Sequence, residues 1–386
     1  MPMLILAVLL HSVPLGVQEW RNGPPFGPQY FPIAVWLQDP SNAPRYKAAG
    51  FNLYVGLWQG PTQLQLDTLS KAGMPVICEQ NEVGLRNIGN PIIVGWMHQD
   101  EPDNAQPVTD PKTGAQGWGP CVPPQKVVDE YLAMRRRDPS RPILLNLGQG
   151  VINEQWIGRG PGASLKDYAT YVKGADVVSF DIYPIAGLDR PNPADYLWYV
   201  GAGVSRLVHW TQGRKIVWNC LECTRISNGV RKATPEQVRA EAWMAIIHGS
   251  RGLIYFVHEF KPRFNEHALL DDPPMLAAVT NLNAEIHRLA PIINSPDLAP
   301  PVKPEHASER ASVAAVAKRY NGSVYIFAVG MQNRNTQATF SVPGRAIDGT
   351  AEVLGEGRTI AVKHGTFRDA FGPYQVHLYR IPERRS

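Results

Sequence analysis

The feature that most constrains this chain is a regular alternation of short apolar segments and longer amphipathic ones across residues 31–290. Apolar, strand-like segments occupy 31–38, 51–58, 75–80, 92–99, 142–147, 177–183, 215–221 and 252–258. Patterns typical of helices lie between or after them at 63–72, 124–137, 165–173, 194–211, 234–248 and 274–289. Eight strands that alternate with helices predict a (β/α)8 TIM barrel, an α/β fold, over residues 19–300. A doubly wound sheet is the alternative, but the Gly-rich phosphate turn that it requires after its first strand is missing.

The pattern changes after a proline-rich segment at 300–304. Short runs of alternating apolar and polar residues follow at 312–320, 322–330, 337–342, 350–354, 359–362 and 374–380. Turns such as Asn321-Gly322 separate these runs. This spacing predicts a C-terminal all-β sandwich domain over residues 310–386.

Composition narrows the class of protein. Apolar residues make up 44% of the chain and charged residues 19%, which is ordinary for a globular protein. The formal charge of +4 is small and its lysines and arginines are scattered, so nucleic acid is not an expected partner. The four cysteines form neither a disulfide scaffold nor a complete zinc site, and we expect no metal and no cofactor.

The first 18 residues have the length of a signal peptide, with an apolar run from Leu4 to Leu10 that is too short to span a membrane. The sequence therefore predicts a secreted or periplasmic protein without a membrane span. It leaves the oligomeric state open.

Acidic residues follow the fourth apolar segment directly. Residues 92–99 run into Asp100 and Glu101, and Asp103 comes after one proline. Active sites of (β/α)8 barrels lie at the carboxyl ends of the strands, where the βα loops open. We therefore interpret Glu101 as one half of a catalytic carboxylate pair. The long loop at 104–124 is expected to wall one side of the same cleft.

A second carboxylate follows the seventh strand, where Glu222 comes directly after 215–221. Strands four and seven lie nearly opposite each other across a barrel, so Glu101 and Glu222 are expected to share one cleft. Two carboxylates facing across a sugar are the minimum for cleavage of a glycosidic bond. One of them donates a proton to the leaving oxygen and keeps that proton through a raised pKa.

A glutamate after strand four and another at the end of strand seven resemble the arrangement in clan A of the retaining glycoside hydrolases, which are (β/α)8 barrels. The resemblance covers roughly residues 31–290. It implies that Glu101 is the acid/base and Glu222 the nucleophile. Many clan members have Asn before the acid/base, whereas this chain has Asp100, so Asp100 as the true acid, supported by Glu101, is left open.

Other side chains near strand ends are candidates for substrate binding. The resemblance implies that Tyr183, after strand six, hydrogen-bonds the nucleophile and that His258 belongs to a platform on the last strand. Alternatives are that the tryptophans fill the barrel and that Glu79 forms an ion pair on the rim. The full set of binding candidates is Trp36, Trp58, Glu79, Asn81, Asp100, Asn146, Asp181, Tyr183, Trp218 and His258.

The leading hypothesis is a retaining glycoside hydrolase that cleaves a β-glycosidic bond of an oligo- or polysaccharide with two glutamates. A non-catalytic carbohydrate-binding barrel and an inverting glycosidase are the alternatives, because spacing in sequence does not fix spacing in space. A metal-dependent barrel hydrolase would need His-x-His after strand one, where the chain has Trp36-Leu37-Gln38. In each surviving case the expected partner is a carbohydrate.

Overall fold

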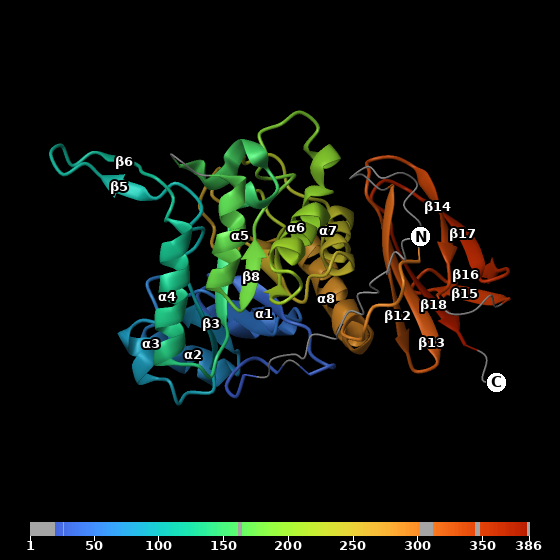
Figure 1. The fold of residues 1–386 in the computed structure, drawn as a ribbon, viewed down its shortest axis with the longest axis horizontal. Coiled ribbons are helices and arrows are strands. Elements are labelled where there is room, and N and C mark those ends of the chain that lie inside the picture. Colours follow the sequence, from blue (N-terminus) through green and yellow to red (C-terminus); the bar gives the residue numbers. More distant parts are fainter. Residues whose placement is uncertain (1–19, 26, 161–163, 302–311, 344–347, 384–386) are drawn as a thin grey trace, which may run out of the picture.

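The protein consists of a (β/α)8 barrel followed by a smaller β domain, as the sequence predicts (Figure 1). The computed structural model describes residues 20–25, 27–160, 164–301, 312–343 and 348–383. The barrel strands are β1 Ile33–Trp36, β2 Leu53–Val55, β3 Val76–Glu79, β4 Ile93–Met97, β7 Ile143–Leu147, β8 Val177–Phe180, β9 Ile216–Val217, β10 Asn219–Glu222 and β11 Leu253–Phe256. Its helices are α1 Ala43–Ala48, α2 Gln63–Ala72, α3 Glu82–Arg86, α4 Pro124–Arg137, α5 Tyr168–Tyr171, α6 Tyr199–Trp210, α7 Pro235–Ile247 and α8 Pro273–Ile293.

The seventh barrel strand is built from two segments, β9 and β10, which are separated only by Trp218. The lower segment β9 pairs with β8, and the upper segment β10 pairs with β11. Because β11 also pairs with β1, the sheet closes on itself through parallel pairs. All the carboxyl ends of the strands therefore meet at one mouth.

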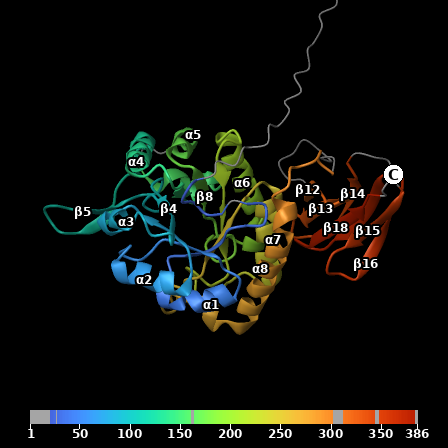
Figure 2. The ribbon, with the colours of Figure 1, turned by 90° about the horizontal axis from the view of Figure 1, so that it is seen from below.

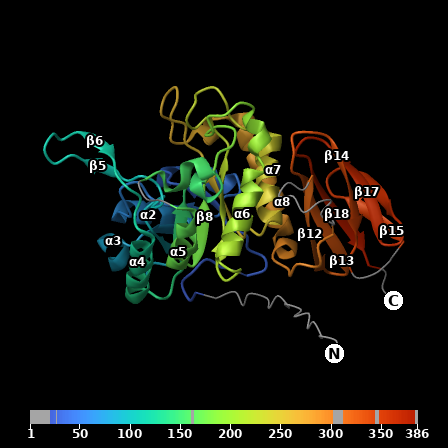
Figure 3. The same cartoon turned by 45° about the horizontal axis from the view of Figure 1, so that its top comes forward.

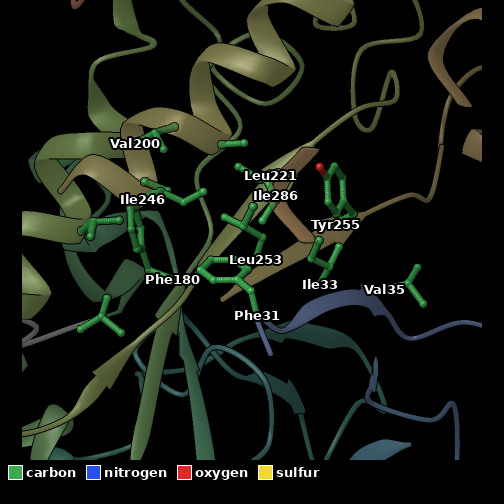
Figure 4. Packing of buried hydrophobic residues seen from close by; sticks show 14 of the residues in the cluster. Phe31, Ile33, Val35, Phe180, Val200, Leu221, Ile246, Leu253, Tyr255 and Ile286 are labelled. Atoms are coloured by element: carbon green, nitrogen blue, oxygen red, sulfur yellow. The ribbon is translucent and has the colours of Figure 1, made fainter. Parts of the chain in front are cut away.

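The alternation of side chains along each strand separates two apolar cores. Inside the barrel, Ala34, Val55, Ile77 and Ile254 pack together with Trp218. The opposite faces of the same strands pack against the helices, and Figure 4 shows Leu221, Leu253 and Ile286 in this outer layer. Burial on both faces explains why these strands have nearly continuous apolar sequences.

Local signals fix several helix ends where the sequence predicts them. Helix α2 starts at a Thr62 capping box and ends at Gly73, which adopts a left-handed conformation. Helix α7 starts at a second capping box formed by Thr234 and Gln237. Helix α8 runs four residues beyond the predicted end at 289 and passes through Pro291.

The C-terminal domain contains β12 Val313–Tyr320, β13 Ser323–Gly330, β14 Thr336–Ser341, β15 Gly349–Val353, β16 Arg358–Val362, β17 Thr366–Phe371 and β18 Val376–Pro382. Its strands form an antiparallel five-stranded sheet and a two-stranded sheet made of β14 and β17. The sequence pattern does not predict strand β17, because Arg368 and Asp369 interrupt its alternation of apolar residues. Asp369 lies inside the domain and pairs with Arg358 at 2.8 Å.

The C-terminal domain has an apolar core of its own, and one of its faces also packs into the outer core of the barrel. Helices α7 and α8 lie against β12 and β13 (Figure 2). The rings of Trp243 and Phe327 are 5.0 Å apart across this junction. Val376 and Leu378 from the last strand belong to the same buried cluster as the outer layer of the barrel.

The loop after β4 differs from the expected wall of the cleft. It contains a hairpin of β5 Pro107–Thr109 and β6 Gln116–Trp118, which projects away from the barrel (Figure 3). Trp118 is 76% exposed on this hairpin.

The predicted signal peptide at 1–18 lies outside the described residues. Among the residues that are described, no helix is long and apolar enough to cross a membrane.

Candidate active site

A network of polar side chains connects four strands at the mouth of the barrel. Asn146 on β7 donates a hydrogen bond from Nδ2 to Oδ1 of Asp100, at 2.9 Å. Ser179 on β8 donates from Oγ to Oδ1 of Asn146 at 2.7 Å, and Sγ of Cys220 on β10 lies 3.6 Å from the same oxygen. Asn146 is buried, so the network holds the exposed carboxyl of Asp100 in a fixed position.

Asp100 has a raised pKa although solvent reaches it. The surrounding protein atoms desolvate its carboxyl and, together with the negative charge of Glu101, raise its pKa to about 7. Hydrogen bonding from Asn146 opposes this rise. Asp100 therefore titrates near neutral pH at the entrance to the barrel.

Asp181 follows β8 and joins the same acidic cluster. Burial raises the pKa of Asp181 well above its ordinary value, and the charge of Glu101, a hydrogen bond with Glu101 and the charge of Asp100 raise it further. Tyr183 interacts with the Asp181 carboxyl and partly offsets the rise. Asp181 and Tyr183 are half-buried, so this carboxyl lies at the wall of the mouth, with its Oδ1 atom buried.

Glu101 is held by its backbone and by its neighbour Gly148. Its φ of 44° is rare for a residue with a side chain, and its backbone N–H donates to the carbonyl of Asn146 at 3.2 Å. A Cβ added at Gly148 would lie 2.8 Å from Oε1 of Glu101, so the carboxylate rests against this glycine. Glu101 is half-buried and accessible at the mouth.

Asp103 positions the loop beneath Glu101. Its two carboxyl oxygens accept hydrogen bonds from the backbone N–H of Gly148 at 2.9 Å and from the hydroxyl of Tyr168 at 2.8 Å. Asp103 is fully buried, and this burial raises its pKa to about 6. The loop that carries Glu101 is thereby tied to the loop after β7.

Glu222 has a different environment. Its side chain is fully buried, and its two oxygens accept hydrogen bonds from the backbone N–H groups of Ile185 at 2.7 Å and Ala186 at 2.6 Å. Burial raises the pKa of Glu222 to about 7, while these amides, Glu241 and Arg231 lower it. The carboxylate that sequence reasoning places face to face with Glu101 thus anchors the loop after β8.

Glu241 on α7 is the acidic neighbour of Glu222. Burial and the charge of Glu222 raise the pKa of Glu241 well above its ordinary value. Neither of its oxygens has a well-formed hydrogen bond to a described residue. Sequence reasoning missed Glu241, although a carboxylate in the apolar run from Ala240 to Ile247 was a visible signal.

The remaining predicted binding residues divide between the core and the rim. Trp36 and Trp218 belong to the core inside the barrel, and Trp218 is fully buried against Gly252, so it is a core residue rather than a lining one. Asn81 caps α3 by accepting a hydrogen bond from the backbone N–H of Gly84 at 2.9 Å. Trp58 is 69% exposed.

Glu79 and His258 lie at the ends of two barrel strands. Glu79 is exposed at the end of β3. His258 is buried, lies 3.3 Å from Nε2 of Gln38, and has its pKa lowered to about 4 by burial. It is therefore uncharged at neutral pH. Within the described residues, no group of His, Cys, Asp and Glu side chains could hold a metal ion.

Comparison with known proteins supports the fold. No protein-family model matches the sequence, and no curated protein sequence matches it. Among solved structures, AmyP in complex with maltose has a TM-score of 0.52 at 9% identity, covering 92% of this chain and 97% of AmyP. A β-L-arabinopyranosidase from Geobacillus stearothermophilus in complex with arabinose has a TM-score of 0.52 at 11% identity, covering 92% of this chain and 98% of that one. The predicted resemblance to glycoside hydrolases therefore holds at the level of the fold.

Proposed function

We propose that this protein is a glycoside hydrolase whose reaction takes place at Asp100, Glu101 and Asp181. The observation that carries the proposal is that these three acidic residues lie together at the barrel mouth and none of them is fully buried, with pKa values raised to different extents for Asp100 and Asp181. Hydrolysis of a glycosidic bond needs one protonated and one ionised carboxyl group beside the sugar. The likeness in fold to an arabinopyranosidase and to a maltose-bound protein supports a carbohydrate substrate.

The sequence-based form of the proposal is a retaining enzyme for β-linked glycans, with Glu101 as acid/base and Glu222 as nucleophile. In that form Glu222 would have to leave the amides of Ile185 and Ala186 to reach a sugar. A second assignment uses two residues that are only half-buried at the mouth. In it, Asp181 donates the proton to the leaving oxygen, and Glu101 acts as the carboxylate that attacks the sugar or activates water.

Variants of the three acids separate these assignments. Wild type and Glu101→Gln, Asp181→Asn and Glu222→Gln variants would be assayed on a panel of aryl α- and β-glycosides and on oligosaccharides. Both assignments expect Glu101→Gln to lose at least about a hundredfold in kcat, the lower range for loss of an acid or base. The exposed Glu82→Gln on α3 is the matched control and should retain full activity.

The position of the second carboxylate follows from the other two variants. A further variant, Glu222→Ala, tests the nucleophile: its rescue by azide, with formation of a glycosyl azide, would favour the sequence-based form. Loss of turnover in Asp181→Asn, with Glu222→Gln folded and active, would favour the second assignment. The anomeric configuration of the first product, followed by NMR, distinguishes retention from inversion. Full activity of Glu101→Gln would exclude both forms.

A non-catalytic carbohydrate-binding barrel is the competing function. If this is the function, the wild type should bind oligosaccharides and release no product from any of them.

Export is a further proposal, based on the apolar run in residues 1–18, and N-terminal sequencing of protein from the culture medium would test it.

A further inference from the structure

An exposed loop with two aromatic and two basic residues lies beside the barrel mouth. It follows β11 and has the sequence Phe260-Lys261-Pro262-Arg263-Phe264. Phe260 is 50% exposed and Phe264 is 62% exposed. Neighbouring exposed aromatic side chains of this size are typical of a binding surface.

A chain of ring contacts connects this loop to the acidic cluster. The ring of Tyr183, which interacts with Asp181, lies 5.2 Å from the ring of Phe256. Phe256 lies 6.1 Å from Phe260, and Phe260 lies 5.6 Å from Phe264. A ligand that extends outward from Asp181 would therefore pass over aromatic faces until it reaches the loop.

The base of the loop is fixed, so its two rings are presented in a defined position. Glu259 and Asn265 exchange backbone hydrogen bonds at 2.9 and 2.8 Å, which closes the loop. The guanidinium of Arg225 binds both oxygens of Glu259, at 2.9 and 3.0 Å. Such preorganisation lowers the entropy cost of binding.

The charges of the loop are available to a ligand. Lys261 and Arg263 are exposed, and within the described part of the chain neither makes an ion pair or a hydrogen bond. The acid nearest in sequence, Glu259, is occupied by Arg225. The cluster at the barrel mouth is acidic instead of basic, with Asp100 and Glu101 side by side. The two ends of the aromatic path therefore favour ligand groups of different charge.

We propose that residues 260–264 bind an anionic sugar unit, carrying a carboxylate or a sulfate, of a glycan whose uncharged neighbouring unit occupies the acidic cluster. This inference rests on the proposed hydrolase function and specifies its substrate class. The faces of Phe260 and Phe264 stack on the sugar ring, while Lys261 and Arg263 pair with its anionic group. Negative charge at the mouth disfavours an anionic unit at the bond that is cut.

The test is binding to an array of neutral, uronate-containing and sulfated oligosaccharides of several lengths. The full-length Glu101→Gln variant is used as the background, so that no glycan is cut during the measurement. We expect Lys261→Ala/Arg263→Ala to lose roughly tenfold in affinity for anionic glycans, about 1.4 kcal/mol, and little for neutral ones. Phe260→Ala/Phe264→Ala should weaken both classes. Comparison of the affinities for uronate-containing and sulfated oligosaccharides identifies the anionic group.

A matched control removes two positive charges elsewhere. Lys71→Ala/Arg136→Ala alters exposed residues of α2 and α4, and it should bind like the background protein. An equal loss in this control, binding that is unaffected by the loop variants, or no binding to any anionic glycan would overturn the proposal.

Hydrolysis assays of the wild type separate the two claims. Normal hydrolysis with binding that does not depend on the loop overturns only the subsite. Binding that depends on the loop without hydrolysis of any glycan overturns the hydrolase and leaves the anionic sugar site supported.

Discussion

The carboxyl groups of Glu101 and Asp181 interact directly, although they follow strands β4 and β8 and lie 80 positions apart in the sequence. Two such groups resist simultaneous ionisation, because each negative charge disfavours the other. Burial, the charge of Glu101 and the hydrogen bond with Glu101 raise the pKa of Asp181 well above its ordinary value, which favours its protonated form. A proton donor and its partner are thus available before a substrate arrives.

Asp100 is expected to set the upper pH limit of activity. Its pKa of about 7 means that it is neutral below this pH and adds a negative charge beside Glu101 above it. We therefore expect kcat/KM of the wild type to fall as the pH rises through about 7. Asp100→Asn should move this fall to higher pH while keeping activity at pH 6 within about tenfold. Complete loss of activity in Asp100→Asn at every pH would instead make Asp100 the acid that donates the proton.

Gly148→Ala is expected to displace the Glu101 carboxylate. The new Cβ would lie 2.5 Å from Nδ2 of Asn104 and 2.8 Å from Oε1 of Glu101, closer than atoms can approach. Since a small displacement of a catalytic group is costly, kcat should fall at least tenfold, on the order of the losses known for misplaced groups. Gly89→Ala is the control, because no atom lies within 4 Å of its Cβ position. Steady-state kinetics and the melting temperature of both variants test this; wild-type kcat in Gly148→Ala would contradict it.

Glu241→Gln is expected to be at least as stable as wild type at pH 7. The fold keeps Glu241 protonated, whereas the unfolded chain ionises it near its ordinary pKa of 4.5. The wild type therefore loses stability as the pH rises above about 4.5, because its unfolded state releases a proton that the folded state retains. Glutamine does not titrate, so the free energy of unfolding of the variant should rise relative to that of the wild type as the pH rises.

Urea unfolding at pH 4.5 and at pH 7 measures this difference in free energy of unfolding. The gain of Glu241→Gln over the wild type should be larger at pH 7. Glu236→Gln, at the exposed start of α7, serves as the control. A variant less stable than wild type at pH 7, with no change at pH 4.5, would show that Glu241 is ionised in the fold.

Lys318→Met is expected to weaken the junction between the domains. The buried ammonium of Lys318 donates to the carbonyls of Ile293 at 2.9 Å and Ser295 at 2.8 Å, and pairs with Asp297. Methionine leaves these carbonyls without their donor, at a cost of about 1–3 kcal/mol. Urea unfolding of Lys318→Met and of the exposed control Lys363→Met would measure the difference. Equal stability of the two variants would mean that the ammonium contributes nothing.

The sequence was sufficient for the fold but only partly sufficient for the site. Helix α2 begins and ends at the predicted residues because a capping box and Gly73 act locally, and α4 ends as predicted before Asp138-Pro139. The acidic cluster after β4 could be recognised because a barrel brings all its strand ends to one mouth. The surroundings of Glu222 could not be predicted from the sequence. They depend on the backbone amides of Ile185 and Ala186, 37 and 36 positions away, and on Glu241 of helix α7.

The core shared by α7, α8 and β18 has a consequence for synthesis of the protein. Val376 and Leu378 in β18 help to cover helices α7 and α8, which are synthesised more than 80 positions earlier. A nascent chain that has completed only the barrel would carry an uncovered apolar flank, which favours aggregation. Loss of β18 through premature termination would therefore make the barrel itself prone to aggregation, and not only the C-terminal domain.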